Sequence, residues 1–219
     1  MLLIGNGYVV TREAARPLVA NGAVAIEGGT IAAVGALDAL KARYPGAEFI
    51  DARGGVIMPG LINAHNHIYS SFARGMAIKG YAAKGFIEIL DGLWWTLDRH
   101  LKNADNRLSA DMTFVDCIEN GVTTVIDHHA SYGEIAGSLF QLAESAKELG
   151  VRACLCYEVS DRDGHEKMME GVLENEAFIN YAKKDESGRI AALFGLHAPF
   201  TLSNKTLETC AAHNPGAGY

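Results

Sequence analysis

Short apolar runs separated by turn residues make up the first part of the chain. Two such runs, 23–26 and 30–34, flank a Gly-Gly pair, which is the pattern of a tight β-hairpin. A short helical stretch over 37–44 is followed by a Pro-Gly pair, which stops a helix. The pattern therefore predicts a small β-rich domain over residues 1–55.

From residue 56 onward, short apolar runs alternate with longer segments of helical period. Gly121 and Gly150 each follow a helical segment, where a left-handed C-terminal cap is favoured. Strands that alternate with helices predict an α/β fold with a parallel sheet and crossover helices over residues 56–219. The predicted strands are 56–64, 122–127, 151–159 and 190–197, and the predicted helices are 104–120, 134–149, about 165–184 and one that begins after Ser203 as N-cap.

The connection between the first two predicted strands is much longer than the later ones. Its extra length, 68–103, contains many glycines and the adjacent residues Trp94 and Trp95. A long insertion at the carboxyl end of a strand is where such folds place lids and substrate walls. The two tryptophans fit packing within such a wall better than a stacking platform.

Charge and cysteine usage narrow the class of protein. The 26 acidic and 19 basic side chains give a formal charge of −7, and an acidic chain is repelled by nucleic acid and anionic lipid. No positively charged leader precedes the first apolar residues, and no apolar run reaches the roughly 20 residues of a membrane span. The four cysteines have no Cys-x-x-Cys spacing and lie in apolar segments, as reduced thiols do. We therefore expect a cytoplasmic protein with no nucleic-acid or membrane partner.

His65 and His67 directly follow the first predicted strand. On an extended chain, residues two apart project to the same side, so both imidazoles can hold one divalent metal. Taken alone, a His-x-His pattern also occurs in surface or hydrogen-bonded histidines. The preceding residues make the metal site the favoured interpretation.

Segment 59–67, PGLINAHNH, resembles the signature of the amidohydrolase superfamily, in which a Pro-Gly segment leads into His-x-His. Segments 63–70, 123–131 and 154–163 resemble its cytosine-deaminase and chlorohydrolase branch, most closely the SsnA-type aminohydrolases. The resemblance covers the whole chain. It implies a (β/α)₈ TIM barrel with a β-sandwich, of which residues 1–55 are the sandwich portion and 56–219 about four β/α units.

The resemblance also implies a metal-dependent hydrolase acting on C–N bonds, with His65 and His67 as metal ligands. Substrates would be cyclic amines or amidines such as purine, pyrimidine or triazine derivatives, and zinc is favoured over iron. Relatives with two metals carry a Lys or Glu at the end of the fourth strand, and segment 190–200 contains neither. One divalent metal is therefore expected. Release of halide instead of amine, as in a chlorohydrolase, stays an alternative.

Three further histidines are candidate substrate-binding residues. His197, in FGLHAPFT at 194–201, matches a histidine that contacts substrate in related deaminases. His128 and His129 end the second predicted strand and face the same end of the barrel. For these two, a ring paired with Asp127 beside an exposed ring is an equally good interpretation.

The barrel expected from the resemblance is incomplete within this sequence. A TIM barrel takes about 250 residues, and segment 56–219 supplies roughly half of its strands. Catalytic zinc takes three protein ligands, so two histidines predict that the chain alone is inactive, with the general acid and other ligands outside it. The alternative to an enzyme is a non-catalytic fragment. Such a fragment would self-associate through its open sheet edges or pair with a separate C-terminal half.

Overall fold

The computed structural model describes residues 1–76 and 78–219. It divides the chain into two compact units, Met1–Gly60 and Leu61–Tyr219. Each unit has its own sheet, so each is described by itself. The expectation of a sandwich portion over 1–55 and a half barrel over 56–219 stays a prediction.

The first unit is a sheet of order β3-β2-β1-β4, with β5 also pairing with β1. The predicted hairpin is confirmed, because β2 and β3 pair antiparallel around Gly28 and Gly29, both of which have positive φ. Buried apolar side chains of β1, β2 and α1 form its core. Its elements are β1 (Leu2–Val10), β2 (Leu18–Glu27), β3 (Thr30–Ala36), α1 (Leu37–Arg43), β4 (Glu48–Asp51) and β5 (Val56–Ile57).

The prediction of one strand over 56–64 is wrong. Its first part, β5, pairs parallel with β1 in the first unit. Its second part, β6 (Leu61–Asn66), pairs parallel with a strand of the second unit. Pro59 lies between them, and it has no N–H to continue a ladder.

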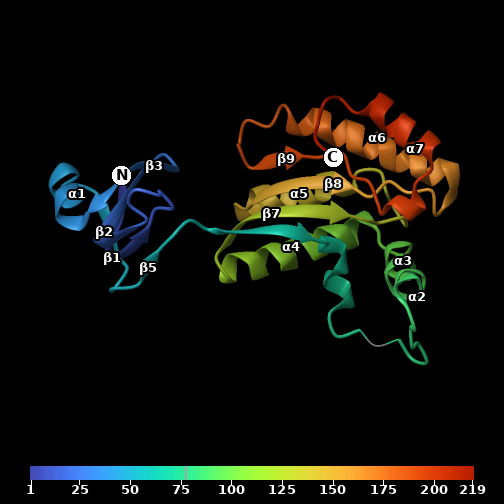
Figure 1. The fold of residues 1–219 in the computed structure, drawn as a ribbon, viewed down its shortest axis with the longest axis horizontal. Helices are drawn as coiled ribbons and strands as arrows, with labels where there is room; N and C mark the ends of the chain where they lie inside the picture. The colour runs from blue at the N-terminus through green and yellow to red at the C-terminus, as the bar shows by residue number, and fades with distance from the viewer. Residues whose placement is uncertain (77) are drawn as a thin grey trace. The chain divides into compact units, whose positions relative to one another are not determined.

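The second unit is a four-stranded parallel sheet of order β6-β7-β8-β9 covered by helices, which confirms the predicted alternation (Figure 1). Phe114, Leu139 and Phe178, from three helices, pack with Val125 and Leu155 of the strands in its main core. The remaining elements of the sheet and its helices are α4 (Asn103–Glu119), β7 (Val122–His129), α5 (Ser138–Leu149), β8 (Arg152–Tyr157), α6 (Gly164–Ala182), β9 (Ile190–Ala192) and α7 (Asn204–His213).

Strand β9 is shorter than the predicted strand 190–197 because a side chain replaces part of its ladder. Asn175 of α6 accepts hydrogen bonds from the backbone N–H groups of Tyr157 and Gly195. It also donates to the carbonyl oxygen of Tyr157. The chain stays aligned beyond this point, since Val159 and Leu196 form a parallel bridge.

Two helix starts follow from capping. Ser203 caps α7 as predicted, accepting a hydrogen bond from the N–H of Thr206. Helix α5 begins at Ser138, four residues later than predicted, where Gly137 adopts a left-handed φ of 85°. The Glu174 carboxylate of α6 accepts hydrogen bonds from the N–H groups of Gly137 and Leu139, so the N-terminus of α5 is capped from a neighbouring helix.

The predicted insertion 68–103 forms short helical segments at the carboxyl ends of the strands. Figure 1 shows α2 and α3 beyond the strand arrowheads. Ala77, within the predicted insertion, lies outside the described residues. Among the helices described, none is long and apolar enough to cross a membrane. The segments are η1 (Ile68–Ala73), α2 (Phe86–Ile89), η2 (Leu90–Trp94) and α3 (Trp95–Asp98).

Candidate metal and substrate site

A pocket of about 720 Å³ lies at the carboxyl ends of β6 to β9. In the TIM barrel that the sequence predicts, active sites occur at this end of the sheet. The strands and the loops after them supply its polar groups, and the insertion supplies an apolar wall. The polar lining includes His65, His67, His128, Glu158 and His197, and the apolar wall includes Phe86, Leu90 and Trp94.

The predicted metal ligands lie together. His65 and His67 bring their Nε2 atoms to 3.2 Å from each other. Two nitrogens bound to one tetrahedral zinc, at about 2.0–2.1 Å each, would lie roughly 3.3 Å apart. The same separation is a hydrogen bond when His65 carries its proton on Nε2. The geometry therefore fits two ligands of one metal without rearrangement of the strand.

Neighbouring strands hold this pair in position. His67 Nδ1 lies 2.9 Å from the carbonyl oxygen of His128, and a carbonyl only accepts, so Nδ1 carries the proton. With Nδ1 donating to this carbonyl, Nε2 is the ring nitrogen that can bind a metal, the arrangement found around histidine ligands of metals. Beside it, buried Asp127 accepts a hydrogen bond from the N–H of Ile68 at 2.6 Å and one from Asn66 at 3.3 Å.

The other predicted histidines separate into two groups. His128 lines the pocket and donates from Nε2 to the carbonyl oxygen of Leu196 at 3.1 Å, and burial lowers its pKa to about 4. His129 points to the other face of β7, is fully buried, and bonds Ser131. Neither ring hydrogen-bonds Asp127, whose bonds go to Asn66 and Ile68. The structure thus brings His128 to the pocket and does not bring His129 there.

His197 enters the pocket from the loop after β9. Its Nδ1 lies 2.8 Å from the hydroxyl oxygen of Thr201, whose own proton goes to the carbonyl oxygen of Ala198. The hydroxyl therefore accepts from Nδ1–H, and Nε2 is left with a free lone pair. Burial lowers the pKa of His197 to about 4, so the ring is neutral at pH 7.

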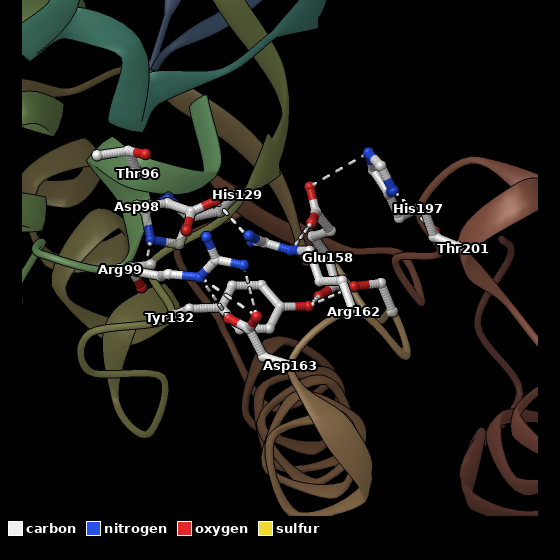
Figure 2. Close-up of polar contacts among 12 residues, drawn as sticks. Thr96, Asp98, Arg99, His129, Tyr132, Glu158, Arg162, Asp163, His197 and Thr201 are labelled. Atoms are coloured by element: carbon white, nitrogen blue, oxygen red, sulfur yellow. Dashed lines mark hydrogen bonds and ion pairs between the residues drawn. The ribbon is translucent and has the colours of Figure 1, made fainter. Parts of the chain in front are cut away.

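Arg162 forms a buried ion cluster next to the pocket, with its guanidinium 2.5 Å from Asp98 and 3.3 Å from Glu158 (Figure 2). Its Cζ lies 3.6 Å from the centre of the Tyr132 ring, a cation–π contact. The side chains of Arg162, Asp98 and Glu158 are only 4%, 1% and 6% exposed. The adjacent Arg99 and Asp163 form a second, more exposed ion pair.

Two carboxylates share one guanidinium in this cluster, so its charge is not balanced. Burial, opposed by Arg162, raises the pKa of Glu158 to about 7 and that of Asp98 to about 6. Burial also raises the pKa of Asp127 to about 8, opposed by its hydrogen bonds from Ile68 and Asn66. Perturbed carboxyl groups beside a pocket are typical of functional sites.

Among residues 1–76 and 78–219, no set of three or more His, Cys, Asp and Glu side chains gathers as a metal site. Cys154 and Cys156, which share a strand with Glu158, have thiol pKa values raised by burial. Without a metal they are therefore protonated at neutral pH. Among the residues that the structure describes, His65 and His67 are thus the candidate ligands of the predicted metal site.

Comparison with known proteins identifies the family. The chain belongs to the amidohydrolase family, whose sequence profile matches residues 56–215. Residues 22–47 match the imidazolonepropionase-like composite domain of bacteria. The predicted superfamily and fold class are therefore confirmed, and the more specific resemblance to SsnA-type aminohydrolases stays a prediction.

Curated relatives are deaminases by name. A 5-methylthioadenosine/S-adenosylhomocysteine deaminase of Thermococcus sibiricus is 31% identical over 94% of this chain and 45% of its own length. A 5'-deoxyadenosine deaminase of Methanosarcina acetivorans is 30% identical over 99% of this chain and 47% of its own. The chain thus spans about half the length of the curated relatives it matches.

Solved structures share the fold. The guanine deaminase of C. acetobutylicum with bound guanine has a TM-score of 0.79 at 18% identity, over 96% of this chain and 49% of that one. The atrazine chlorohydrolase TrzN of Arthrobacter aurescens, complexed with zinc, has a TM-score of 0.76 at 21% identity, over 97% of this chain and 50% of that one. These likenesses support the barrel-type α/β fold of four β/α units.

Sequence reasoning did not find the Arg162 cluster or the role of Asn175. The one local signal is the charged run at 161–163, and charged turns at strand ends are usually solvated. Its partner Asp98 lies in the insertion, 64 positions away. Nothing in the local pattern indicates that the two segments meet.

Proposed function

We propose that this protein is a metal-dependent hydrolase of C–N bonds other than peptide bonds, and that it deaminates a cyclic amine or amidine. The observation that carries the proposal is the His65–His67 pair, with 3.2 Å between its Nε2 atoms, at the carboxyl end of a barrel-type sheet. Family membership and the deaminase names of the relatives support the reaction class. The substrate class extends to purine, pyrimidine and triazine derivatives.

His65 and His67 would hold one divalent metal, with zinc favoured over iron because imidazole nitrogens suit it and a structural neighbour was solved with zinc. A metal bound there supplies Lewis acidity that lowers the pKa of water from about 15.7 to about 7. Asp127 fixes the backbone and side chain around the pair through Ile68 and Asn66. The apolar wall of the insertion excludes water from the substrate ring.

His197 and His128 are the proposed substrate-binding histidines. His197 offers the free lone pair of Nε2, which accepts a hydrogen bond from a substrate N–H. His128 is neutral and fixed by the Leu196 carbonyl, so it positions a ring without adding charge. The side chain of His129 is buried on the other face of β7, so we propose no substrate contact for it.

The test measures ammonia release by the protein purified, through an N-terminal affinity tag, from the cells that naturally produce it. With zinc and a panel of aminopurines, aminopyrimidines and aminotriazines, we expect ammonia from at least one class, and no ammonia after zinc is removed by a chelator. The 219-residue chain expressed by itself supplies two of the three protein ligands that catalytic zinc takes, so we expect no turnover from it.

Each competing function has its own outcome in this assay. Chloride release from chlorotriazines without ammonia release would support a chlorohydrolase. A metal-free oligomer that converts none of the substrates would support a non-catalytic fragment, which either self-associates or pairs with a separate C-terminal half. Ordinary turnover by the 219-residue chain alone would contradict its proposed inactivity.

We further propose a small-molecule substrate as the principal partner and a cytoplasmic location. The four cysteines are all free, which fits a reducing compartment. The formal charge of −7 disfavours nucleic acid and anionic membranes as partners.

A further inference from the structure

Glu158 is a buried carboxylate at the edge of the pocket with an unmet capacity to accept hydrogen bonds. Its side chain is 6% exposed and lines the pocket. Its Oε1 is buried without a hydrogen-bond partner, although Arg162 Nε lies 3.3 Å away. Its Oε2 lies 3.8 Å from Nε2 of His197, beyond hydrogen-bonding distance.

His197 and Glu158 together form a pair of acceptors. Thr201 fixes the proton of His197 on Nδ1, so its Nε2 accepts. Ionised Glu158 can only accept. Two acceptors 3.8 Å apart cannot satisfy each other, but they can receive two N–H groups from adjacent atoms of one ligand. Figure 2 shows Oε2 of Glu158 and the ring of His197 facing each other.

The charge of the cluster favours the same kind of ligand. Asp98 and Glu158 share the single guanidinium of Arg162, which leaves one negative charge in excess. A ligand that donates N–H groups to Glu158 would stabilise that charge without a second buried cation. The apolar wall formed by Phe86, Leu90 and Trp94 suits a planar ring.

We propose that Glu158 and His197 jointly bind a pair of adjacent N–H donors on a heterocyclic substrate. This edge is found in 2-aminopyrimidin-4-one and guanine, where a ring N–H lies beside an amino group. The inference rests on the proposed function, because it places the substrate of that reaction in this pocket. It makes Glu158 a specificity-determining residue.

The proposal discriminates between purine types. The corresponding edge of adenine or 4-aminopyrimidine presents one donor and one ring-nitrogen acceptor. An acceptor placed against Glu158 or His197 would leave both lone pairs unsatisfied in a buried site. The acceptor pair therefore selects the donor–donor edge over the adenine-type edge.

The first experiment measures binding of single-ring probes to the chelator-treated 219-residue chain by ligand-observed NMR titration. We expect 2-aminopyrimidin-4-one to bind at least about tenfold more tightly than pyrimidin-4-one or 4-aminopyrimidine. That difference in affinity is what one additional charge-assisted hydrogen bond contributes. Glu158→Gln should reduce binding of the first probe about tenfold and leave the other two nearly unchanged. Glu176→Gln, at a surface pair with His213, is the matched control and should change none.

The second experiment needs no variant, so it holds even if Glu158→Gln fails to fold. Free Glu158 has a pKa of about 7, and only its ionised form accepts charge-assisted hydrogen bonds, so affinity for 2-aminopyrimidin-4-one should rise from pH 6 to pH 8 and then level off. His197, with a pKa of about 4, stays neutral throughout this range. The other charged or titratable groups that influence Glu158 are Arg162, Asp98, Asp163, Tyr69 and Tyr132.

The outcomes separate this inference from the hydrolase proposal, because the probes are tested without metal. Equal binding of the three probes, no detectable binding, or affinity that does not rise with pH would overturn the role of Glu158 and His197. Selective binding by a protein that never holds a metal would leave this inference standing while the hydrolase proposal fails.

Discussion

Arg162→Met should lower the free energy of unfolding at pH 8 by about 3–5 kcal/mol, the usual cost of breaking a buried ion pair from one side. The variant would leave Asp98 and Glu158 buried without a cation, since their side chains are 1% and 6% exposed. It would also remove the stacking on Tyr132. Urea unfolding monitored by circular dichroism measures the change.

The loss should depend on pH in a defined direction. The folded-state pKa values of Asp98 and Glu158, about 6 and about 7, are raised above their ordinary values, so the folded chain binds more protons than the unfolded chain between about pH 4 and pH 7. Without Arg162 these pKa values rise further. The penalty of the variant is therefore larger at pH 8 than at lower pH, and it has largely disappeared below about pH 6, where both carboxyls are neutral with or without Arg162.

Arg99→Met is the matched control in the same cluster. Arg99 pairs with Asp163, but its side chain is 37% exposed, and a pair of that kind contributes about 0–1 kcal/mol. Equal losses in the two variants, or a loss in Arg162→Met that grows as the pH falls, would contradict the assignment of Arg162 as the buried counter-ion.

Asn175→Leu should cost about 3–5 kcal/mol, because the leucine fills similar volume but satisfies none of the backbone groups that the amide serves. Asn175 is fully buried and accepts from the N–H groups of Tyr157 and Gly195 at 2.9 and 3.2 Å. It donates to the carbonyl oxygens of Tyr157 and Gly171 at 2.9 and 3.1 Å. Chemical denaturation at pH 7 measures the loss.

Asn180→Leu tests the same substitution on the exposed face of the same helix, and it should change stability by less than about 0.5 kcal/mol. The two variants differ in burial and hydrogen bonding alone. A cost below about 1 kcal/mol for Asn175→Leu would mean that the backbone of Tyr157 and Gly195 finds other partners, and the account of the short strand β9 would be wrong.

The sequence predicted the elements whose signals are local. The hairpin around Gly28 and Gly29, the alternation of strands and helices, and the cap at Ser203 all depend on neighbours in sequence, and the structure has each of them. The prediction of one strand over 56–64 was wrong at Pro59, because the apolar pattern continues across the boundary between two sheets. Apolar pattern alone does not report which sheet a strand joins.

The candidate site was predictable in part for the same reason. His65 and His67 meet because they alternate on one extended chain, which spacing alone determines. Whether His128 or His129 enters the pocket depends on which face of β7 is turned inward, and two adjacent histidines give no signal for that choice. Arg162, Glu158 and Asp98 meet only through the tertiary fold, so no periodicity could have placed them together.

The most direct test of the account is the metal content of the protein purified from its own cells, measured by inductively coupled plasma mass spectrometry after dialysis. We predict about one zinc per chain in the wild type and less than about a tenth of that in the variant with both His65→Ala and His67→Ala. A variant that replaces exposed His100 and His165 with alanine should keep its zinc. Unchanged zinc in the folded His65→Ala, His67→Ala protein would contradict the central claim.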